Sequence, residues 1–283
     1  MKSVSEMSPA EALGLRYILM DIDDTITREG KLPASSYAAL WKLKEAGLAV
    51  IPVTGRPAGW CDLIAREWPV DGVIGENGAL VFWEESAGED VPGTEHPETQ
   101  TYGSAQRRPR FRSEYHPNAV RNDHPVLKRI REQALAEIPL LRDAGDQFAR
   151  LFDIALDFAE EEPVLPLSAA ERVRAIALAE GARAKVSSIH INIWMGDYDK
   201  LSMTGHFLQS RFGWLPGTGD REVVFVGDSP NDEPMFARFP LACAVANIRR
   251  YEGLIRHYPA FAAEKECGEG FAEIAEMILK KRR

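Results

Sequence analysis

Residues 17–25 read Tyr-Ile-Leu-Met-Asp-Ile-Asp-Asp-Thr, so four apolar residues run directly into a polar segment with three carboxylates. Apolar runs that end in polar residues recur farther along the chain, at residues 48–54, 73–78, 223–228 and 241–247. Continuous apolar runs suit strands that are covered on both faces, which is how parallel strands are buried. A helical stripe at 35–46 that stops at Gly47 supplies the first crossover between strands. These features predict βαβ units and a Rossmann-like parallel sheet.

The middle of the chain, residues 84–196, has a different pattern. Polar and apolar residues alternate at 188–193, which is typical of an antiparallel sheet with one apolar face. Two helix patterns can cover that face, at 126–138 and from the capping box Ser168-Ala-Ala-Glu171 to Gly181. The sequence therefore predicts an α/β protein with a core made of residues 1–83 and 197–283. An α/β cap domain, residues 84–196, is inserted into that core.

Composition restricts the partners and the location. Thirty-four basic and 43 acidic residues give a net charge of -9, which disfavours a nucleic-acid-binding surface. No apolar stretch approaches the roughly 20 residues of a membrane helix, and the first residues lack the features of a secretion signal. The three cysteines, Cys61, Cys243 and Cys267, are too far apart to suggest a disulfide framework or a zinc site. We expect a cytoplasmic enzyme with a small-molecule partner, no nucleic acid and no membrane, and no oligomeric state is predicted.

Carboxylates that follow the predicted strands point to a metal site. Asp21 and Asp23 follow one strand, and Asp228 and Asp232 follow another. Open parallel sheets bind ligands beyond the carboxyl ends of their strands, so these acids can meet at one crevice. Four acids there would repel one another unless a cation lay among them, and oxygen ligands suit Mg²⁺. A D-x-D pair by itself is more often a turn or a helix cap, and an EF-hand is excluded because its glycine and glutamate are missing.

Two further segments favour a phosphate ligand. Thr54 and Gly55 follow a strand at a tight turn into a helix, so a hydroxyl and the adjacent amides can hold an anion there. An ordinary helix cap is the alternative interpretation of Thr54. Lys200 lies at the start of a predicted helix over 201–211, where the macrodipole disfavours a cation unless an anion binds. A solvated surface lysine is the alternative interpretation of Lys200.

The order of these motifs resembles a known family. D-I-D-D-T at 21–25, V-T-G-R at 53–56, Lys200 and V-G-D-S-P-N-D at 226–232 are similar to the four motifs of the haloacid dehalogenase (HAD) superfamily of phosphohydrolases. The E-N-G turn at 76–78, before a long α/β insert, is similar to the Cof-type, or type IIB, branch. That branch includes sugar phosphatases and is related to sucrose-, trehalose- and mannosyl-3-phosphoglycerate phosphatases.

The resemblance implies a Mg²⁺-dependent phosphomonoester hydrolase that acts through an aspartyl-phosphate. Asp21 is then the nucleophile, and Asp23 is the general acid and base. An oxygen of Asp21, the backbone carbonyl of Asp23 and Asp228 are the implied metal ligands. Among the remaining motif residues, Thr54, Gly55 and Lys200 are the implied phosphate-binding residues. Asn231 and Asp232 have an implied supporting role.

The polar face of the cap sheet is expected to roof the crevice and to select the leaving group. The predicted substrate contacts are Asn77, Arg110, Arg112, His190 and Asn192. A merely solvated sheet face is the alternative for the cap residues. The expected substrate is a small phosphorylated metabolite, either a sugar phosphate or a glycosyl-phosphoglycerate. Phosphomannomutase-like transfer and a non-catalytic sensor of a phosphometabolite are the alternative functions, and the intact acids Asp21 and Asp23 count against the sensor.

Overall fold

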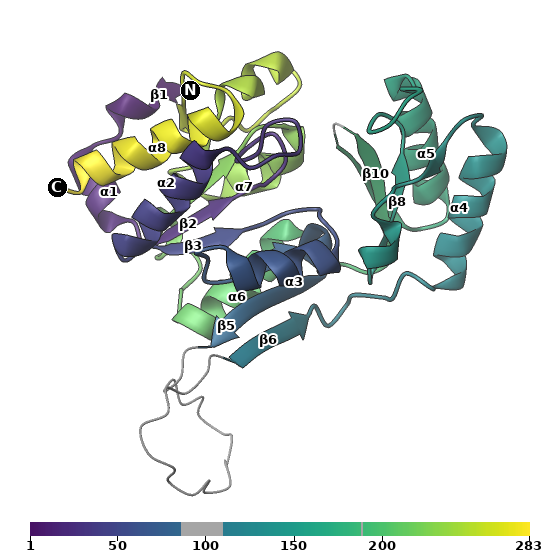
Figure 1. Ribbon diagram of the computed structural model, residues 1–283, viewed down its shortest axis with the longest axis horizontal. Helices are drawn as coiled ribbons and strands as arrows, with labels where there is room; N and C mark the ends of the chain where they lie inside the picture. The colour runs from purple at the N-terminus through teal and green to yellow at the C-terminus, as the bar shows by residue number, and fades with distance from the viewer. Residues whose placement is uncertain (86–109, 188) are drawn as a thin grey trace, which may run out of the picture.

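The computed structural model describes residues 1–85, 110–187 and 189–283, and these form two lobes (Figure 1). The larger lobe contains a six-stranded sheet in which all neighbouring strands are parallel. Its strands are, in spatial order, β1 (Lys2–Ser3), β13 (Phe261–Ala262), β12 (Cys243–Ala244), β11 (Val223–Gly227), β2 (Tyr17–Met20) and β3 (Ala49–Pro52). The predicted Rossmann-like parallel sheet is therefore confirmed.

Both faces of this sheet are covered, as the continuous apolar runs predicted. On β2, Ile18 and Met20 contact one buried apolar cluster, and Tyr17 and Leu19 contact the other. The first cluster includes side chains of four helices, α1 (Pro9–Gly14), α2 (Ala34–Glu45), α3 (Ala58–Glu67) and α8 (Cys267–Lys281). The second includes side chains of α6 (Lys200–Phe212) and α7 (Glu233–Arg238). Burial on both faces fixes where β2 ends, and hence where Asp21 lies.

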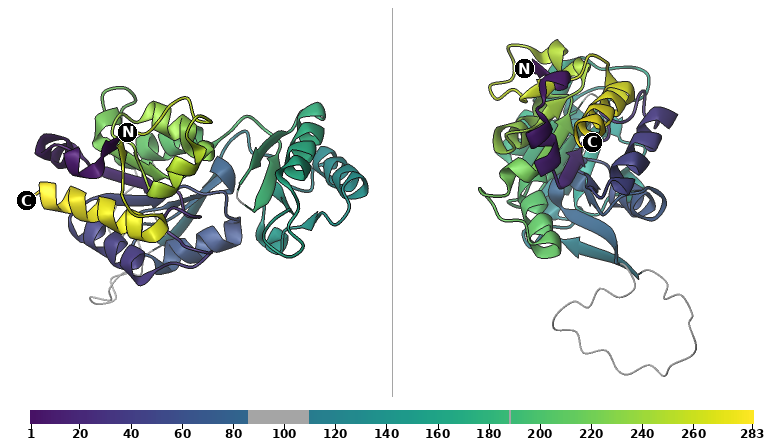
Figure 2. Two further views of the ribbon diagram at one scale, coloured as in Figure 1. Left: turned by 90° about the horizontal axis from the view of Figure 1, so that it is seen from above. Right: turned by 90° about the vertical axis from the view of Figure 1, so that its left-hand side faces the viewer.

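The smaller lobe contains an antiparallel sheet that is covered by two helices. The strands are, in spatial order, β7 (Arg142–Asp143), β8 (Asp153–Asp157), β10 (His190–Trp194) and β9 (Arg183–Val186). Helices α4 (Pro125–Glu137) and α5 (Leu167–Ala179) pack on its apolar side chains and lie on the face turned away from the larger lobe (Figure 1). Figure 2 shows the same separation of the two lobes from above. The alternating pattern at 188–193 thus predicted the sheet type correctly.

The predicted start of α5 is wrong. The N-cap is Pro166, and Ser168 lies inside the first turn instead of capping it. The proline ring fixes φ near the value that a helix start needs, so the helix begins before the capping-box sequence.

The remaining short helices are η1 (Val4–Glu6), η2 (Glu76–Gly78), η3 (Gln147–Ala149), η4 (Asp220–Glu222), η5 (Pro230–Asp232) and η6 (Ala246–Tyr251).

A third, antiparallel sheet corrects part of the sequence interpretation. It has the order β4 (Val73–Gly75), β5 (Leu80–Glu85) and β6 (Arg110–Tyr115), and a parallel bridge between Val53 and Ile74 joins it to the core. Arg110 and Arg112 therefore do not lie on the cap sheet, as was expected, but on a different sheet beside the core. The alternating pattern predicted a strand there but did not predict its partner, because pairing depends on contacts distant in sequence.

None of the helices in the described part of the chain is both long and apolar enough to cross a membrane.

Gly78 lies very close to the backbone of Asp199, where the chain returns from the smaller lobe to the core. Its φ is +104°, and a Cβ added there would lie 2.1 Å from the carbonyl oxygen of Asp199. We predict that Gly78→Ala lowers the free energy of unfolding by at least about 3 kcal/mol, since backbone strain and steric overlap add. Gly181→Ala is the matched control, because φ is +78° there but no atom lies within 4 Å. Urea unfolding of both variants measures the difference, and equal losses would contradict the close-approach argument.

Candidate active site

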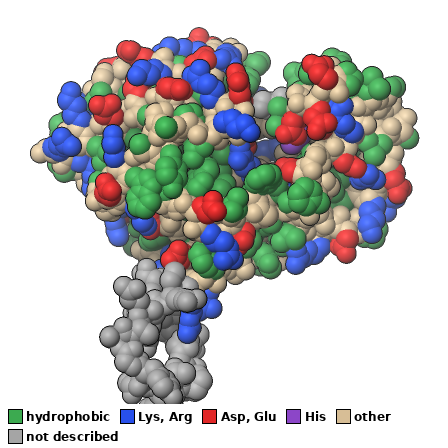
Figure 3. All heavy atoms as spheres, in the orientation of Figure 1, with side chains coloured by type: hydrophobic (Ala, Val, Ile, Leu, Met, Phe, Trp, Pro, Cys, Tyr) green, Lys and Arg blue, Asp and Glu red, His purple; other side chains and the backbone are tan. Residues whose placement is uncertain are grey.

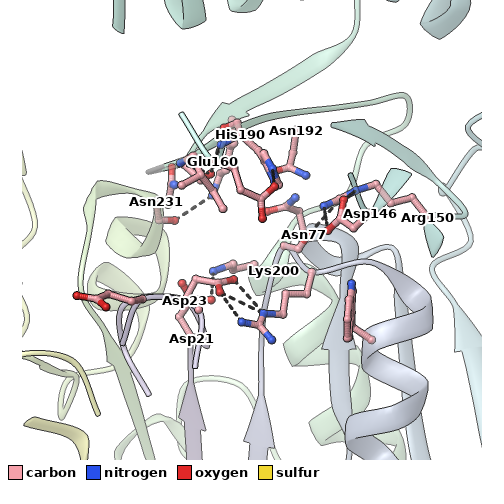
Figure 4. Close-up of a pocket in the computed structure, with 18 of the residues that line it drawn as sticks. Asp21, Asp23, Asn77, Asp146, Arg150, Glu160, His190, Asn192, Lys200 and Asn231 are labelled. Carbon is pink, nitrogen blue, oxygen red and sulfur yellow. Dashed lines mark hydrogen bonds and ion pairs between the residues drawn. The ribbon is translucent and has the colours of Figure 1, made fainter. Parts of the chain in front are cut away.

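A cleft of about 500 Å³ lies between the two lobes, at the carboxyl ends of the core strands (Figure 3). The core side contributes Asp21 and Asp23 after β2, Gly55 after β3, Asn77 in η2, Lys200 at the start of α6 and Asn231 in η5. The smaller lobe contributes His190 and Asn192 of β10. The close-up in Figure 4 shows the lobe residues opposite Asp21, Asp23 and Lys200. Chain segments that are far apart in sequence thus meet as predicted.

The other predicted residues lie outside the lining of this cleft. Thr54, Asp228 and Asp232 are buried beside it, and they connect to it through their neighbours. Arg110 and Arg112 are exposed on β6, and Arg112 pairs with Glu85 of the adjacent strand. The two arginines therefore do not contact the cleft.

Lys200 is the cation at the centre of the site. Its ammonium nitrogen lies 2.9 Å from Oδ1 of Asp21 and 3.2 Å from Oδ1 of Asp232. Lys200 is the first residue of α6, and Asp199 caps that helix by accepting a hydrogen bond from the amide of Ser202. Only 5% of Lys200 is exposed, so the solvated-lysine alternative is wrong. Two carboxylates offset the cost of placing this cation at a helix N-terminus.

Asp228 and Asp232 are held by hydrogen bonds beneath the cleft. Oδ2 of Asp232 accepts a hydrogen bond from the amide of Asp228 at 3.1 Å. A Cβ on Gly227 would lie 2.3 Å from that oxygen, so only glycine allows this approach. Oδ1 of Asp228 accepts a hydrogen bond from the hydroxyl of Thr25 at 3.1 Å. The motif spacing from Gly227 to Asp232 therefore has a direct steric reason.

Asn247 is a supporting residue that the sequence interpretation did not include. Its side-chain nitrogen donates to the carbonyl of Asp24 at 2.8 Å and lies 3.4 Å from Oδ2 of Asp228. It thereby links the segment after β12 to the loop after β2. Its position directly after an apolar run was the only sequence signal available.

The buried acids fit a divalent metal ion. One carboxylate oxygen each from Asp21, Asp228 and Asp232 lies within 4.8 Å of the others. Burial raises the pKa of Asp21 to about 7, although Lys200 opposes this rise. Burial and the charges of Asp232 and Asp21 raise the pKa of Asp228 well above its usual value. Three carboxylates face one lysine, so a hard cation with oxygen ligands would complete the charge balance.

Thr54 lies in a tightly bonded loop. Its hydroxyl accepts a hydrogen bond from the amide of Arg56 at 3.1 Å, and its carbonyl accepts one from the amide of Asn77 at 3.0 Å. The N-cap of α3 is Pro57, so Thr54 is not the helix cap that the alternative interpretation assumed. Asn77 has a φ of +56°, and its side-chain nitrogen is buried with no hydrogen-bond partner among the described residues. Asn77 is among the residues that line the cleft, and its side chain lies next to Gly55.

Arg56 pairs with the predicted acid and base, and the sequence interpretation assigned it no role. Its Nη2 lies 2.7 Å and its Nε 3.1 Å from Oδ1 of Asp23. About 42% of the Asp23 side chain is exposed, so this carboxylate is the accessible one of the two motif acids. The only sequence signal for Arg56 was its place in V-T-G-R.

Glu76 joins the base of the smaller lobe to the core, and it was not among the site residues predicted from the sequence. Its carboxylate accepts hydrogen bonds from the amides of Ala58 at 2.9 Å, Leu151 at 2.8 Å, Phe152 at 2.6 Å and Asp153 at 3.1 Å. One side chain of the core thus holds three successive amides where the chain enters β8. These contacts fix the lobe at the end nearest the Thr54 loop.

Arg150 makes a second connection at this junction. Its Nη1 donates to the carbonyl of Gly55 at 3.1 Å and to Oδ1 of Asp153 at 2.9 Å. Its Nη2 donates to Asp146 at 3.0 Å. The guanidinium therefore ties the loop that carries Thr54 to the smaller lobe.

The polar face of the lobe sheet is buried over the cleft. Nε2 of His190 lies 2.7 Å from a carboxylate oxygen of Glu160, and Asn192 donates to Oδ2 of Asp153 at 3.0 Å. His190 and Asn192 are only 6% and 7% exposed. The alternative of a solvated sheet face is therefore wrong for these two residues.

The comparisons with known proteins agree with this architecture. Residues 18–98 match the model of the haloacid dehalogenase-like hydrolase family. No curated protein sequence matches the chain significantly. Among solved structures, a HAD/Cof-like hydrolase from Plasmodium vivax is 15% identical, with a TM-score of 0.66 over 96% of this chain and 99% of that one. A haloacid dehalogenase-like hydrolase from Bacteroides thetaiotaomicron is 15% identical, with a TM-score of 0.60 over 93% and 99%.

Another similar structure is the sucrose-phosphatase from Synechocystis, which is 12% identical with a TM-score of 0.55 over 93% of this chain and 97% of that one. At such identities, structural likeness shows the fold. The predicted resemblance is confirmed: the chain shares the fold of these HAD-like structures, and residues 18–98 match the family model.

The carboxyl group of Glu76 makes the stability of the chain depend on pH. Burial, together with the charge of Asp153, raises the pKa of Glu76 from 4.5 to about 7. Between these values the folded chain holds a proton that the unfolded chain has released, so stability falls as pH rises from about 4.5 to 7. We predict that Glu76→Gln removes up to about 3 kcal/mol of this pH-dependent loss.

Urea unfolding at pH 4.5 and pH 7.5 measures this change. Any constant loss caused by the new amide cancels, because only the difference between the two pH values is compared. Glu84→Gln, at an exposed position on β5, is the matched control and should follow the wild type. A Glu76→Gln variant with the same pH dependence as the wild type would show that this carboxyl group is not perturbed.

Proposed function

We propose that this protein is a phosphatase that hydrolyses phosphomonoesters of small metabolites, with Mg²⁺, through an aspartyl-phosphate. The observation that carries the proposal is the convergence of Lys200 with Asp21, Asp228 and Asp232 at the floor of a two-lobed cleft. The family match over residues 18–98 and the fold support the same reaction class.

Asp21 is the nucleophile in this proposal. One of its carboxylate oxygens attacks phosphorus, the ester P–O bond breaks, and an aspartyl-phosphate forms. Lys200 lies 2.9 Å from Oδ1 of Asp21, so it orients the carboxylate and offsets the charge of the incoming phosphoryl group. Water then attacks the phosphorus, the bond to Asp21 breaks, and inorganic phosphate leaves.

Asp23 is the proton donor and acceptor. It protonates the leaving oxygen in the first step and takes a proton from water in the second. Asp23 is two residues from the nucleophile, and its side chain is accessible from the cleft. Arg56 holds it at 2.7 Å and thereby keeps it oriented until substrate binds. Asp21, the backbone carbonyl of Asp23 and Asp228 would hold Mg²⁺, which when bound screens the repulsion between nucleophile and phosphate.

The neighbouring residues complete the phosphate site. Thr54, Gly55 and Lys200 bind phosphoryl oxygens, and Asp232 orients Lys200 from 3.2 Å. Asn231 supports that loop. Asn77, whose side-chain nitrogen is buried without a hydrogen-bond partner among the described residues, is the proposed donor to a substrate oxygen.

The smaller lobe is the proposed specificity domain. It is inserted into the core within the predicted segment 84–196, and it does not include β6, which pairs with β5 beside the core. His190, Glu160 and Asn192 present paired polar groups to the cleft, which suit the hydroxyl groups of a sugar. A sugar phosphate or a glycosyl-phosphoglycerate is therefore the proposed substrate class, and the similarity to a sucrose-phosphatase is consistent with it. Three buried, free cysteines suit the reducing cytoplasm, which is the proposed location.

The nucleophile assignment predicts that Asp21→Asn lowers kcat by at least about 10³-fold, since an amide cannot form the acyl-phosphate. The fold should persist, because the amide has the shape of the carboxylate. Phosphate release by the purified variant and its thermal midpoint measure the two effects. Asp62→Asn, in a surface ion pair with Arg66, is the control and should keep full activity. An Asp21→Asn variant with most of its activity would refute the nucleophile role.

The metal assignment predicts that a chelator stops turnover and that added Mg²⁺ restores it. Phosphate release from a panel of sugar phosphates, phosphoglycerates and nucleotides measures both activity and specificity. Activity that is indifferent to the chelator would exclude the metal role. If the wild type releases no phosphate but transfers it between hexose phosphates when a hexose bisphosphate is added, the mutase alternative is correct. Tight binding of one compound with neither reaction would indicate a sensor.

A further inference from the structure

Lys185 of β9 is a second lysine in the cleft, and the proposed mechanism does not use it. It lies in the smaller lobe and lines the cleft together with Lys200. Its Nζ donates a hydrogen bond to the backbone carbonyl of Asn231, in η5 of the core, at 2.9 Å. Asn231 adjoins Asp232, which pairs with Lys200. Lys185 therefore brings a positive charge from the lobe to the edge of the proposed phosphate site.

Lys185 has no close ion pair among the described residues. Among the residues that the structure describes, no carboxylate lies within 4.0 Å of its ammonium group, whereas Lys200 has two such partners. Burial and the charge of Lys200 lower the pKa of Lys185 to about 8, although the more distant carboxylates of Asp232, Asp199 and Asp21 oppose this shift. A lysine ammonium has three donors, and only one of them has an acceptor among the residues that the structure describes. A desolvated cation of this kind is costly unless an anion joins it.

A structural latch between the lobes does not account for this charge. The side chain of Asn231 already joins the same elements, because its Nδ2 donates to the carbonyl of Val186 at 2.9 Å. A neutral side chain would serve a latch equally well, without the desolvation of an ammonium group. A negatively charged ligand would account for the charge.

Even with Mg²⁺ bound, the proposed site leaves the charge of a phosphoryl group without a cation of its own, because Lys200 and Mg²⁺ together only match the carboxylates of Asp21, Asp228 and Asp232. Two donors of Lys200 are directed at Asp21 and Asp232, so these carboxylates offset the charge of Lys200. A phosphoryl group carries up to two negative charges and must approach this acidic floor. A cation on the opposite wall would balance that charge only when the lobe covers the core.

We propose that Lys185 is a substrate-binding residue that donates hydrogen bonds to an anionic oxygen of the phosphomonoester in the closed cleft. The proposal rests on the proposed phosphatase function and adds a contact from the specificity lobe. The anionic oxygen belongs either to the phosphoryl group or to a second acidic group on the leaving portion, and the test separates these sources.

Four proteins are compared: the wild type, Lys185→Met, Lys185→Arg and the control Lys128→Met, which removes an exposed lysine of α4 in the same lobe. Inorganic phosphate, with Mg²⁺ present, is titrated against each protein, and its dissociation constant is obtained from the rise in thermal midpoint. Values of kcat and KM are measured for glucose 6-phosphate and 3-phosphoglycerate.

If Lys185 contacts the phosphoryl group, Lys185→Met weakens phosphate binding by at least about 10-fold, the loss expected for one charge-assisted hydrogen bond. Lys185→Arg recovers part of this affinity, and Lys128→Met matches the wild type. If the contact is to a second acidic group, phosphate binding is unchanged and KM rises only for 3-phosphoglycerate. In both cases the ligand-free midpoint of Lys185→Met stays equal to or above that of the wild type, because a desolvated charge has been removed.

Two results would overturn the proposal. One is a Lys185→Met variant with unchanged phosphate affinity and unchanged KM for both esters. The other is a lower ligand-free midpoint with unchanged phosphate affinity, which would make Lys185 a latch. If the wild type is active, either of these results for the variant leaves the proposed phosphatase function intact. A wild type that neither binds phosphate nor hydrolyses either ester would contradict the proposed function itself.

Discussion

The burial of like charges at one edge of a parallel sheet is the constraint on which the rest of this molecule depends. Asp21, Asp228 and Asp232 bring their carboxylate oxygens within 4.8 Å of one another, and Lys200 pairs with Asp21 and Asp232. Such a cluster is unfavourable in a dry interior unless further positive charge joins it. The same imbalance makes the site receptive to a divalent cation and then to a phosphoryl group held against it.

The strand arrangement and the contacts between the lobes hold these acidic side chains close together. Parallel strands end together, so the loops after β2 and β11 must meet, and glycine at 227 lets Asp232 approach the Asp228 amide. The smaller lobe is attached at two sides of the cleft. Glu76 and Arg150 hold one side, and the contact of Asn231 with Val186 holds the other. The lobe thus shields the buried acids from bulk water, and the lower dielectric strengthens the electrostatic interactions between them.

The core and its acids could be predicted from sequence because each signal was local. An apolar run followed by Asp21 or Asp228 identifies both a strand and the residue that leaves it. The contributions of Glu76, Arg56 and Lys185 could not be predicted in this way, because each depends on a partner distant in the chain. The predicted position of Arg112 was wrong for the same reason, because its strand pairs with β5 and not with the lobe sheet.

The most direct test of the charge imbalance is the thermal midpoint of the wild type and of Asp228→Asn, each with and without Mg²⁺. At a pH above the raised pKa of Asp228, removing its negative charge should raise the midpoint of the metal-free protein, because repulsion with Asp21 and Asp232 is relieved. Mg²⁺ should then stabilise the wild type but have little effect on the variant. If Mg²⁺ leaves the wild type unchanged, or if Asp228→Asn destabilises the metal-free protein, the acids are not held in the unbalanced state described here.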